Sequence, residues 1–230
     1  MGTTKPSTLR IGRRYRANRL AGPYDALVIG SGMGGLTCAA LLSAMGRKVC
    51  VLEQHYTAGG YTHSYERNGY EWDVGLHYVG DVGHGTMLRR LFDFLSDGQL
   101  QWARMDREFD RFHIGDRVYS AIAGREAFRD SLVRRFPGEV AAIDRYFALL
   151  DGVNRAMPLR TTALALGPWS RRLAAPLLNR LQPDYLTRST WDVLRELTDN
   201  TELLAVLCAQ WGDVGLPPKQ SAFLIQALVA

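Results

Sequence analysis

The chain has 230 residues, of which 47% are hydrophobic, and this is enough to bury one substantial core. No apolar segment reaches the roughly 18 residues that a membrane-spanning helix needs, and no basic patch interleaved with aromatic residues favours binding of nucleic acid. The three cysteines are scattered without the spacing of a metal site, so no metal is expected. Cys38 and Cys50 are expected to be small core residues in a reducing compartment.

The net charge of +5 is concentrated at the amino terminus. Residues 1–23 contain six Lys or Arg side chains and no acid, so they carry +6 and leave −1 for the rest of the chain. This segment is expected to be a basic extension, disordered or draped on the surface; the weaker alternative is attraction to anionic lipid headgroups. Because it lacks the apolar core of a signal peptide, we expect a cytoplasmic protein, with a peripheral position at the membrane as the alternative.

A glycine motif directly follows a short apolar run. Residues 26–29 are apolar and rich in β-branched side chains, which predicts a strand buried on both faces, as in a parallel sheet. Gly30, Gly32 and Gly35 then fit the pattern G-x-G-x-x-G. The first glycine permits a tight turn, the second leaves room for a pyrophosphate against the backbone, and the third lets a helix pack closely on the strand.

A helix and a second strand are predicted to complete this unit. Small and apolar residues at helical spacing predict a helix over residues 33–45, which Gly46 ends. Residues 49–52 predict a second strand, and Glu53 follows it, where a carboxylate can accept both hydroxyls of an adenosine ribose. Strand, glycines, helix, strand and acid in this order predict a βαβ unit that binds a dinucleotide, rather than a glycine-rich turn without a ligand.

A hairpin and a helix are predicted after the nucleotide unit. Asn68-Gly69 is a strong hairpin signal, and the two predicted strands beside it are residues 61–66 and 70–74. Residues 85–97 have an amphipathic pattern that predicts a helix, which Gly98 ends.

The second half of the chain is predicted to be mostly helical. Residues 100–121 alternate as strands do, around a hairpin turn at Gly115-Asp116. Residues 124–212 have the helical period, with a break at Pro137-Gly138 and a cap at Asn200.

One helical stretch, residues 159–181, combines leucines and a tryptophan with several arginines. It is predicted to be either an interfacial segment that dips into a membrane or a helical lid packed on the protein itself. Pro168 and Pro176 prevent one long helix and favour the lid.

Three short motifs resemble the flavin-binding start of the phytoene desaturase superfamily. They are Gly30-Ser31-Gly32-Met33-Gly34-Gly35, Glu53-Gln54-His55 and Ala58-Gly59-Gly60. Two further segments, residues 69–80 and 211–218, resemble its retinol saturase and carotenoid isomerase branch. Most members of the superfamily carry an arginine directly after the glycine pair that corresponds to Gly59-Gly60, where this chain has Tyr61. The resemblance covers about the whole chain and is most specific over residues 24–80.

This resemblance implies an α/β fold, with a Rossmann-type FAD-binding domain and an inserted α+β, largely helical substrate domain. It implies FAD as the cofactor and NAD or NADP as the electron donor or acceptor. His77 would line the active site and is the candidate catalytic residue; the alternative is a histidine that satisfies a backbone carbonyl. The residues implied to bind the cofactor are Gly30, Ser31, Gly32, Gly34, Gly35, Glu53, Gly59, Gly60, Asp73 and Gly75.

The predicted domains are the extension, residues 1–23, the first part of a Rossmann-type domain, residues 24–98, and a substrate domain, residues 99–230. Members of the family are longer. Residues 221–230 form an apolar run without a cap, which would leave an apolar face uncovered. The sequence therefore predicts the amino-terminal fragment of a larger two-domain flavoprotein. On its own this fragment is expected to be inactive and to bind FAD weakly or not at all.

The leading functional hypothesis is a FAD-dependent oxidoreductase that acts on carbon–carbon double bonds of a polyene or isoprenoid, by saturation, desaturation or isomerisation. One alternative is an amine-oxidase-like flavoprotein with a polar substrate. The other alternative is a non-enzymatic escort protein that has the same fold and carries prenylated proteins. The complete glycine set and Glu53 argue against this alternative.

Overall fold

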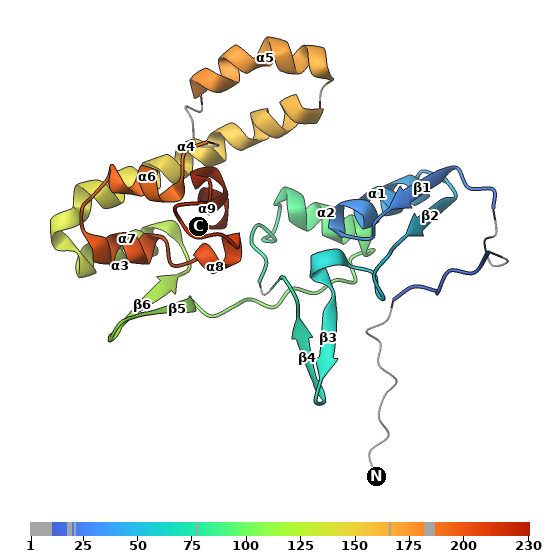
Figure 1. Cartoon of the computed structure of the whole chain (residues 1–230), viewed down its shortest axis with the longest axis horizontal. Coiled ribbons are helices and arrows are strands. Elements are labelled where there is room, and N and C mark those ends of the chain that lie inside the picture. The colour runs from blue at the N-terminus through green and yellow to red at the C-terminus, as the bar shows by residue number, and fades with distance from the viewer. Residues whose placement is uncertain (1–10, 18–19, 21, 77, 166, 182–186) are drawn as a thin grey trace. The chain divides into compact units, whose positions relative to one another are not determined.

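Two compact units, residues 1–103 and residues 104–230, make up the protein in a computed structural model (Figure 1). The structure describes residues 11–17, 20, 22–76, 78–165, 167–181 and 187–230. The finer division into an extension and two domains at residues 23 and 98 stays a prediction.

The first unit contains the predicted βαβ arrangement. Strand β1 (Ala26–Ile29) pairs in parallel with β2 (Val49–Leu52), and helix α1 (Met33–Ala44) connects them. Gly46, with a φ of 78°, ends α1 as predicted, and its amide donates to the carbonyl of Ser43. All three elements lie within one residue of their predicted bounds.

The two-stranded sheet is less enclosed than predicted. Leu27 is 63% exposed and Ile29 is 88% exposed, so β1 is not buried on both faces. Helix α1 covers one face only, and among the described residues no third strand pairs with β1 or β2. Cys50 is half-buried but Cys38 is exposed, so the prediction of a core position for Cys38 is wrong.

Cys38 is exposed because it lies in an apolar groove between α1 and α2 (Met87–Leu95), the helix predicted over residues 85–97. The groove has a volume of about 510 Å³. Helix α1 is therefore apolar both toward the sheet and toward the groove, and it lacks the polar face of an ordinary surface helix. Residues that line the groove include Met33, Cys38, Leu41, Met45, Leu88 and Phe92.

The predicted hairpin lies between these two helices in the sequence. Strand β3 (Ser64–Arg67) pairs antiparallel with β4 (Tyr70–Asp73). Asn68 and Gly69 have φ values of 54° and 79°, as a tight hairpin turn of this kind requires. The first strand begins three residues later than predicted, because the chain first forms a short 3₁₀ helix, η2 (Gly60–Thr62).

The second unit opens with a second hairpin. Strand β5 (Glu108–Ile114) pairs antiparallel with β6 (Arg117–Ile122) around the predicted turn at Gly115-Asp116. The prediction of a strand over residues 100–107 is wrong, because the paired strand begins at Glu108, opposite the end of β6. Just before it, the carbonyl of Arg107 still accepts the amide of Ala123 at 2.7 Å.

Helices fill the rest of the second unit. Pro137-Gly138 interrupts them as predicted, and the side chain of Asn200 caps α7 by accepting the amides of Glu202 and Leu203, each at 3.1 Å. Helix α4 continues through Pro158 instead of ending at the predicted residue, Met157. The elements are α3 (Arg125–Arg135), η3 (Pro137–Glu139), α4 (Val140–Ala165), α5 (Pro168–Leu181), α6 (Thr190–Arg195), α7 (Thr201–Leu207), α8 (Trp211–Val214) and α9 (Phe223–Val229).

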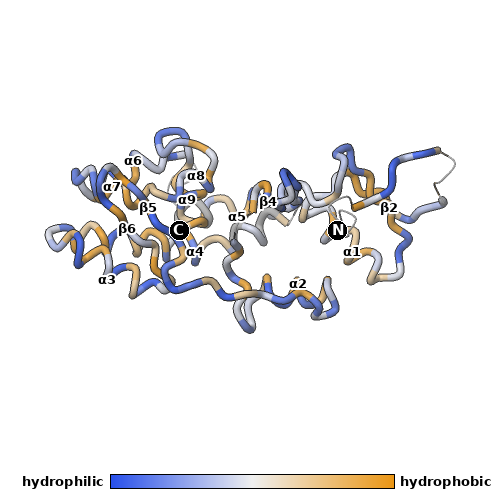
Figure 2. Tube along the Cα trace, turned by 90° about the horizontal axis from the view of Figure 1, so that it is seen from below, coloured by the Kyte–Doolittle hydropathy of each residue, from blue (hydrophilic) through white to orange (hydrophobic). Residues whose placement is uncertain are grey.

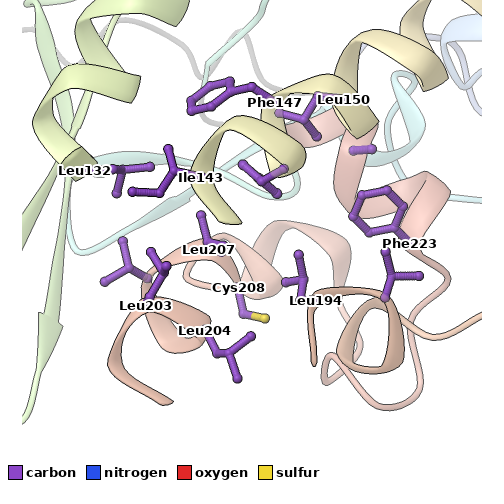
Figure 3. Close-up of a cluster of buried hydrophobic side chains, with 14 of the residues drawn as sticks. Leu132, Ile143, Phe147, Leu150, Leu194, Leu203, Leu204, Leu207, Cys208 and Phe223 are labelled. Atoms are coloured by element: carbon purple, nitrogen blue, oxygen red, sulfur yellow. The ribbon is translucent and has the colours of Figure 1, made fainter. Parts of the chain in front are cut away.

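One hydrophobic core holds the second unit together (Figure 3). The apolar run over residues 221–230 contributes to it, because Phe223, Leu224 and Ala227 of α9 are buried and only Ile225 and Leu228 are largely exposed. The run thus covers most of the apolar face that was expected to be open. The fully buried aliphatic and aromatic members are Ile143, Tyr146, Val153, Leu194, Leu203, Leu204 and Phe223.

Helix α5 packs on α4 with one face and leaves an apolar stripe in solvent. Trp169 is 83% exposed, Leu173 is 80% exposed, and Leu177 follows at the same four-residue spacing. The face of α5 that packs on α4 agrees with the predicted lid, whereas the exposed apolar stripe is typical of the alternative, an interfacial helix. In the part of the chain that the structure describes, no helix is both long and apolar enough to cross a membrane.

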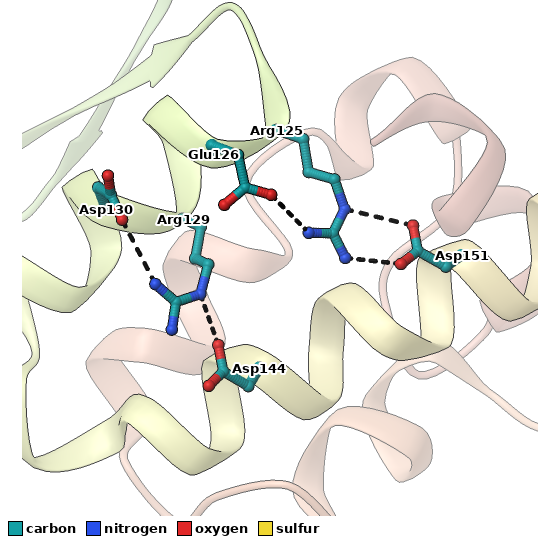
Figure 4. A network of polar contacts seen from close by, with 6 residues as sticks. All are labelled: Arg125, Glu126, Arg129, Asp130, Asp144 and Asp151. Atoms are coloured by element: carbon teal, nitrogen blue, oxygen red, sulfur yellow. Dashed lines mark hydrogen bonds and ion pairs between the residues drawn. The ribbon is translucent and has the colours of Figure 1, made fainter.

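A network of charged side chains joins α3 to α4 (Figure 4). Arg125 Nη2 lies 2.6 Å from Asp151 Oδ2, and Arg129 Nε lies 2.6 Å from Asp144 Oδ1. Arg129 lowers the pKa of Asp144 through this hydrogen bond. These ion pairs are partly exposed, and such pairs typically contribute about 0.2–1 kcal/mol each to the stability of the fold. The network therefore aligns the two helices more than it stabilises the fold.

Candidate dinucleotide-binding site

The glycine loop between β1 and α1 turns as the motif predicts. Gly30 has a φ of 94°, which a residue with a Cβ rarely adopts, and its amide donates to the carbonyl of Leu52 at 2.7 Å. A Cβ on Gly35 would lie 2.1 Å from the Gly30 carbonyl oxygen. Only glycine at position 35 lets α1 pack this closely on the end of β1, which is the role predicted for the third glycine.

The outer side of this loop is open. A Cβ on Gly32 or Gly34 would meet no atom within 4 Å. Gly32 is the N-cap of α1 and supplies no capping side chain, so the amides of the first helical turn are available to a ligand. These amides and the positive end of the helix dipole suit an anion such as a diphosphate. The loop fits the predicted ligand, and contact of Gly32 and Gly34 with it stays a prediction.

Ser31 connects the loop to the acid that follows β2. Its amide donates to Glu53 Oε2 at 2.7 Å and its hydroxyl donates to the same oxygen at 2.5 Å. The other carboxylate oxygen, Oε1, accepts the amide of His55 at 2.8 Å. A carboxylate has about four acceptor positions. In this arrangement Glu53 holds the loop, and a ribose hydroxyl would share the carboxylate with these donors.

These hydrogen bonds favour the charged form of the carboxylate. The Ser31 hydroxyl has the largest effect, the amides of His55 and Ser31 add to it, and the pKa of Glu53 falls from 4.5 to about 2. Glu53 is thus ionised at neutral pH. Its negative charge disfavours a ribose that carries a 2′-phosphate, because two anions would meet there.

The second glycine pair packs against the first loop. Gly59, with a φ of 120°, donates its amide to the carbonyl of Ser31 at 3.0 Å. Gly60, with a φ of 58°, lies so close to Gly32 that a Cβ on it would be 2.8 Å from the Gly32 Cα. Residues 30–35 and 59–60 therefore form one continuous backbone surface, the glycine cradle.

The remaining predicted site residues follow the hairpin. The amide of Gly75 donates to the carbonyl of Tyr61 at 3.1 Å, so Gly75 is held beside the end of the glycine cradle. Asp73 is exposed at the end of β4, opposite Ser64. His77 lies outside the described residues. Among the residues that are described, no group of three or more His, Cys, Asp or Glu side chains could hold a metal ion.

A contact that sequence analysis missed joins the basic extension to the cradle. The amide of Ile11 donates to Thr57 Oγ1 at 3.0 Å, and the amide of Ala58 donates to the carbonyl of Ile11 at 3.2 Å. Thr57 is buried, whereas residues 11–17 are mostly hydrophilic and exposed (Figure 2). The described part of the extension is therefore draped on the surface and anchored next to Gly59. A threonine ahead of a glycine pair gives no sequence signal for such a contact.

Comparison with known proteins defines the class of the fold and site. A family model described as an NAD(P)-binding Rossmann-like domain matches residues 28–95. A solved structure of wild-type putrescine oxidase bound to putrescine is similar with a TM-score of 0.52 and 19% identity, over 90% of this chain and 41% of that chain. At this identity the likeness shows the fold alone. The chain contains a Rossmann-type dinucleotide-binding unit within an α/β fold, as the glycine motif predicts.

Curated relatives narrow this class. All-trans-retinol 13,14-reductase of Danio rerio is 40% identical over 223 residues, which are 94% of this chain and 37% of the relative. The chloroplastic prolycopene isomerase of Daucus carota is 27% identical over 196 residues, which are 81% of this chain and 31% of the relative. The chain thus spans about a third of the length of these relatives. Its resemblance to phytoene desaturase-like FAD oxidoreductases, in the retinol saturase and carotenoid isomerase branch, is confirmed.

Proposed function

We propose that this chain holds the adenosine and diphosphate end of FAD in a FAD-dependent oxidoreductase. The observation that carries the proposal is the glycine cradle, in which two separate glycine motifs meet and Ser31 ties them to Glu53. The second pair, Gly59-Gly60, favours FAD as the bound cofactor, because it belongs to one of the three motifs that resemble the flavin-binding start of the phytoene desaturase superfamily. NAD or NADP would then serve as the electron donor or acceptor.

Each part of the site has a defined role in this proposal. The backbone of residues 30–35 faces the diphosphate, Glu53 accepts a ribose hydroxyl, and residues 59–60 pass close to the cofactor. Asp73 and Gly75 would lie toward the flavin. The role of His77, which lies outside the described residues, stays a prediction. Bound FAD supplies the hydride chemistry, and this chain binds the cofactor, orients it and fixes which ribose it accepts.

We infer that the substrate is a polyene or isoprenoid and that the reaction saturates, desaturates or isomerises a carbon–carbon double bond. The support is the printed names of the relatives, a retinol reductase and a prolycopene isomerase. An amine substrate has weaker support, because the likeness to putrescine oxidase at 19% identity concerns the fold alone.

A peripheral membrane contact through α5 belongs to the same proposal. The exposed stripe of Trp169, Leu173 and Leu177 has Arg171 and Arg172 beside it, and apolar, aromatic and basic side chains together suit an anionic membrane surface. An apolar polyene dissolves in lipid, so contact with a membrane surface would give an enzyme access to it.

Absorption spectroscopy and product analysis test the proposal. In the full-length protein, flavin absorbance that stays with the protein through gel filtration is expected, and a full-length protein that retains no flavin after incubation with FAD contradicts the cofactor. Incubation with a panel of retinols and carotenoids should give a saturated, desaturated or isomerised product on chromatography. Turnover of an amine would support the oxidase alternative, and capture of a prenylated protein by flavin-free protein would support the escort.

A further inference from the structure

Three aromatic rings meet immediately beyond Glu53. The ring centroids of His55 and Tyr56 are 4.2 Å apart, those of His55 and His63 are 4.7 Å apart, and those of Tyr56 and His63 are 5.9 Å apart. Tyr56 is 52% exposed, so these rings lie at the surface and not in a core. We call His55, Tyr56 and His63 the aromatic cluster.

Backbone hydrogen bonds fix both histidine rings of the cluster. His55 Nδ1 lies 3.3 Å from the carbonyl oxygen of Thr57, and His63 Nδ1 lies 2.6 Å from that of Gly60. A carbonyl oxygen only accepts, so Nδ1 carries a proton in both rings, and Nε2 is an acceptor in the neutral imidazole. Each ring thus has a defined orientation and a second nitrogen that these backbone bonds do not use.

The aromatic cluster is joined to Glu53 at one end and to the glycine cradle at the other. The amide of His55 donates to Glu53 Oε1 at 2.8 Å, and the amide of His63 donates to the Gly60 carbonyl at 3.3 Å. In dinucleotide sites the acid after the second strand binds the adenosine ribose. The base of that nucleoside therefore lies on the side of Glu53 away from the diphosphate, where the chain continues into His55 and Tyr56.

We propose that the aromatic cluster forms the wall that binds the adenine of the dinucleotide. This inference rests on the proposed function only in that the ligand of the cradle is an adenine dinucleotide. Exposed aromatic rings stack on nucleobases, and the Nε2 atoms of His55 and His63 can accept a hydrogen bond from the amino group of adenine. Hypoxanthine has an oxygen in place of that amino group, so the site should prefer adenine.

Calorimetric titration of the purified full-length protein, freed of bound cofactor, with ADP tests this inference. Tyr56→Ala removes one ring. His63→Asn removes another ring, while the side-chain amide of the asparagine can still donate to the Gly60 carbonyl. Tyr70→Ala, at an exposed tyrosine on β4 outside the cluster, is the matched control. Stacking contributes about 1–3 kcal/mol per base, so each cluster variant should weaken ADP binding at least about fivefold. Inorganic pyrophosphate, which reports the cradle alone, should bind all variants equally.

The outcomes separate this inference from the proposed function. If the wild-type chain binds FAD and ADP, unchanged ADP affinity in both cluster variants overturns the role of the aromatic cluster and leaves the flavoprotein proposal standing. Equal losses for ADP and pyrophosphate also overturn it, because the cradle and not the base would be affected. Equal affinity of the wild type for ADP and IDP refutes the hydrogen bond to the amino group. A chain that binds neither FAD nor ADP overturns the proposed function itself.

Discussion

The amide and the hydroxyl of Ser31 donate to one and the same oxygen of Glu53. This arrangement joins the glycine loop to the end of β2 and holds the Glu53 carboxylate next to the first turn of α1. The glycines determine the shape of the loop, and the hydrogen bonds between Ser31 and Glu53 determine its position. A change in the charge of Glu53 should therefore alter the loop as well as any contact with a ribose.

Stability at acid pH tests this pair. Because the pKa of Glu53 is lowered to about 2, the carboxylate stabilises the folded chain above pH 4.5, and this contribution is lost as the pH falls through about 2. Glu53→Gln keeps an acceptor oxygen but removes the charge. The difference in melting temperature between the wild type and this variant should be full at pH 6 (about 1.5 pH units above 4.5) and should shrink as the pH falls toward 2. A constant difference across this range would contradict the assignment.

The packing of Gly60 on Gly32 predicts the effect of one added methyl group. Alanine at position 60 would need a φ of 58°, which costs about 1–2 kcal/mol, and its Cβ would stand 2.8 Å from the Gly32 Cα. Gly60→Ala should lower both the thermal stability of the first unit and its affinity for ADP. Gly83→Ala is the control, because its Cβ would meet no atom within 4 Å. Equal behaviour of the two variants would show that the cradle is not closely packed.

The anchor of the basic extension predicts a change in protease sensitivity. Thr57→Val removes the hydroxyl that accepts the amide of Ile11, whereas Thr57→Ser keeps it. A hydrogen bond of this kind contributes about 0.5–1.5 kcal/mol, so tryptic cleavage after Arg13 and Arg14 should become about two- to tenfold faster in the valine variant only. Identical cleavage rates in all three proteins would rule out the anchor.

The βαβ unit could be predicted from sequence because its signals are local. Apolar runs, glycines that need positive φ, and Gly46 at the helix end determine the backbone within a few residues of each position. The same holds for the hairpin at Asn68-Gly69 and for the helix cap at Asn200, where a short motif and its structure coincide.

Other features depend on contacts that no local pattern encodes. The bond of Ile11 to Thr57 spans 46 residues. The exposure of Ile29 and Cys38 depends on which elements cover the sheet and α1, and a strand pattern predicts burial whether or not a cover is present. Helix α4 passes Pro158, although a rule about proline alone predicts that the helix ends there. Val153 and Met157, in the turns before the proline, pack on the core.

The exposed stripe of α5 predicts binding to anionic vesicles. The double variant Trp169→Ser, Leu173→Ser should lower co-sedimentation with vesicles that contain phosphatidylserine by about tenfold or more, because each large apolar side chain contributes about 1.5–3 kcal/mol when it is fully buried. Val118→Ser, at an exposed apolar residue on β6, should have no effect. Equal sedimentation of the wild type and the double variant would argue against the membrane contact.

The FAD content of the purified protein, measured after release by denaturation, tests the central claim most directly. The wild type should contain FAD, and Glu53→Ala should lose it, because this change removes both the ribose acceptor and the bonds to Ser31. Glu108→Ala is the matched control, since Glu108 is another hydrogen-bonded acid with a lowered pKa, bound to Arg111 in the second unit. It should retain FAD. FAD in Glu53→Ala at the wild-type level, or its absence from the wild type, would contradict the assignment of the cradle.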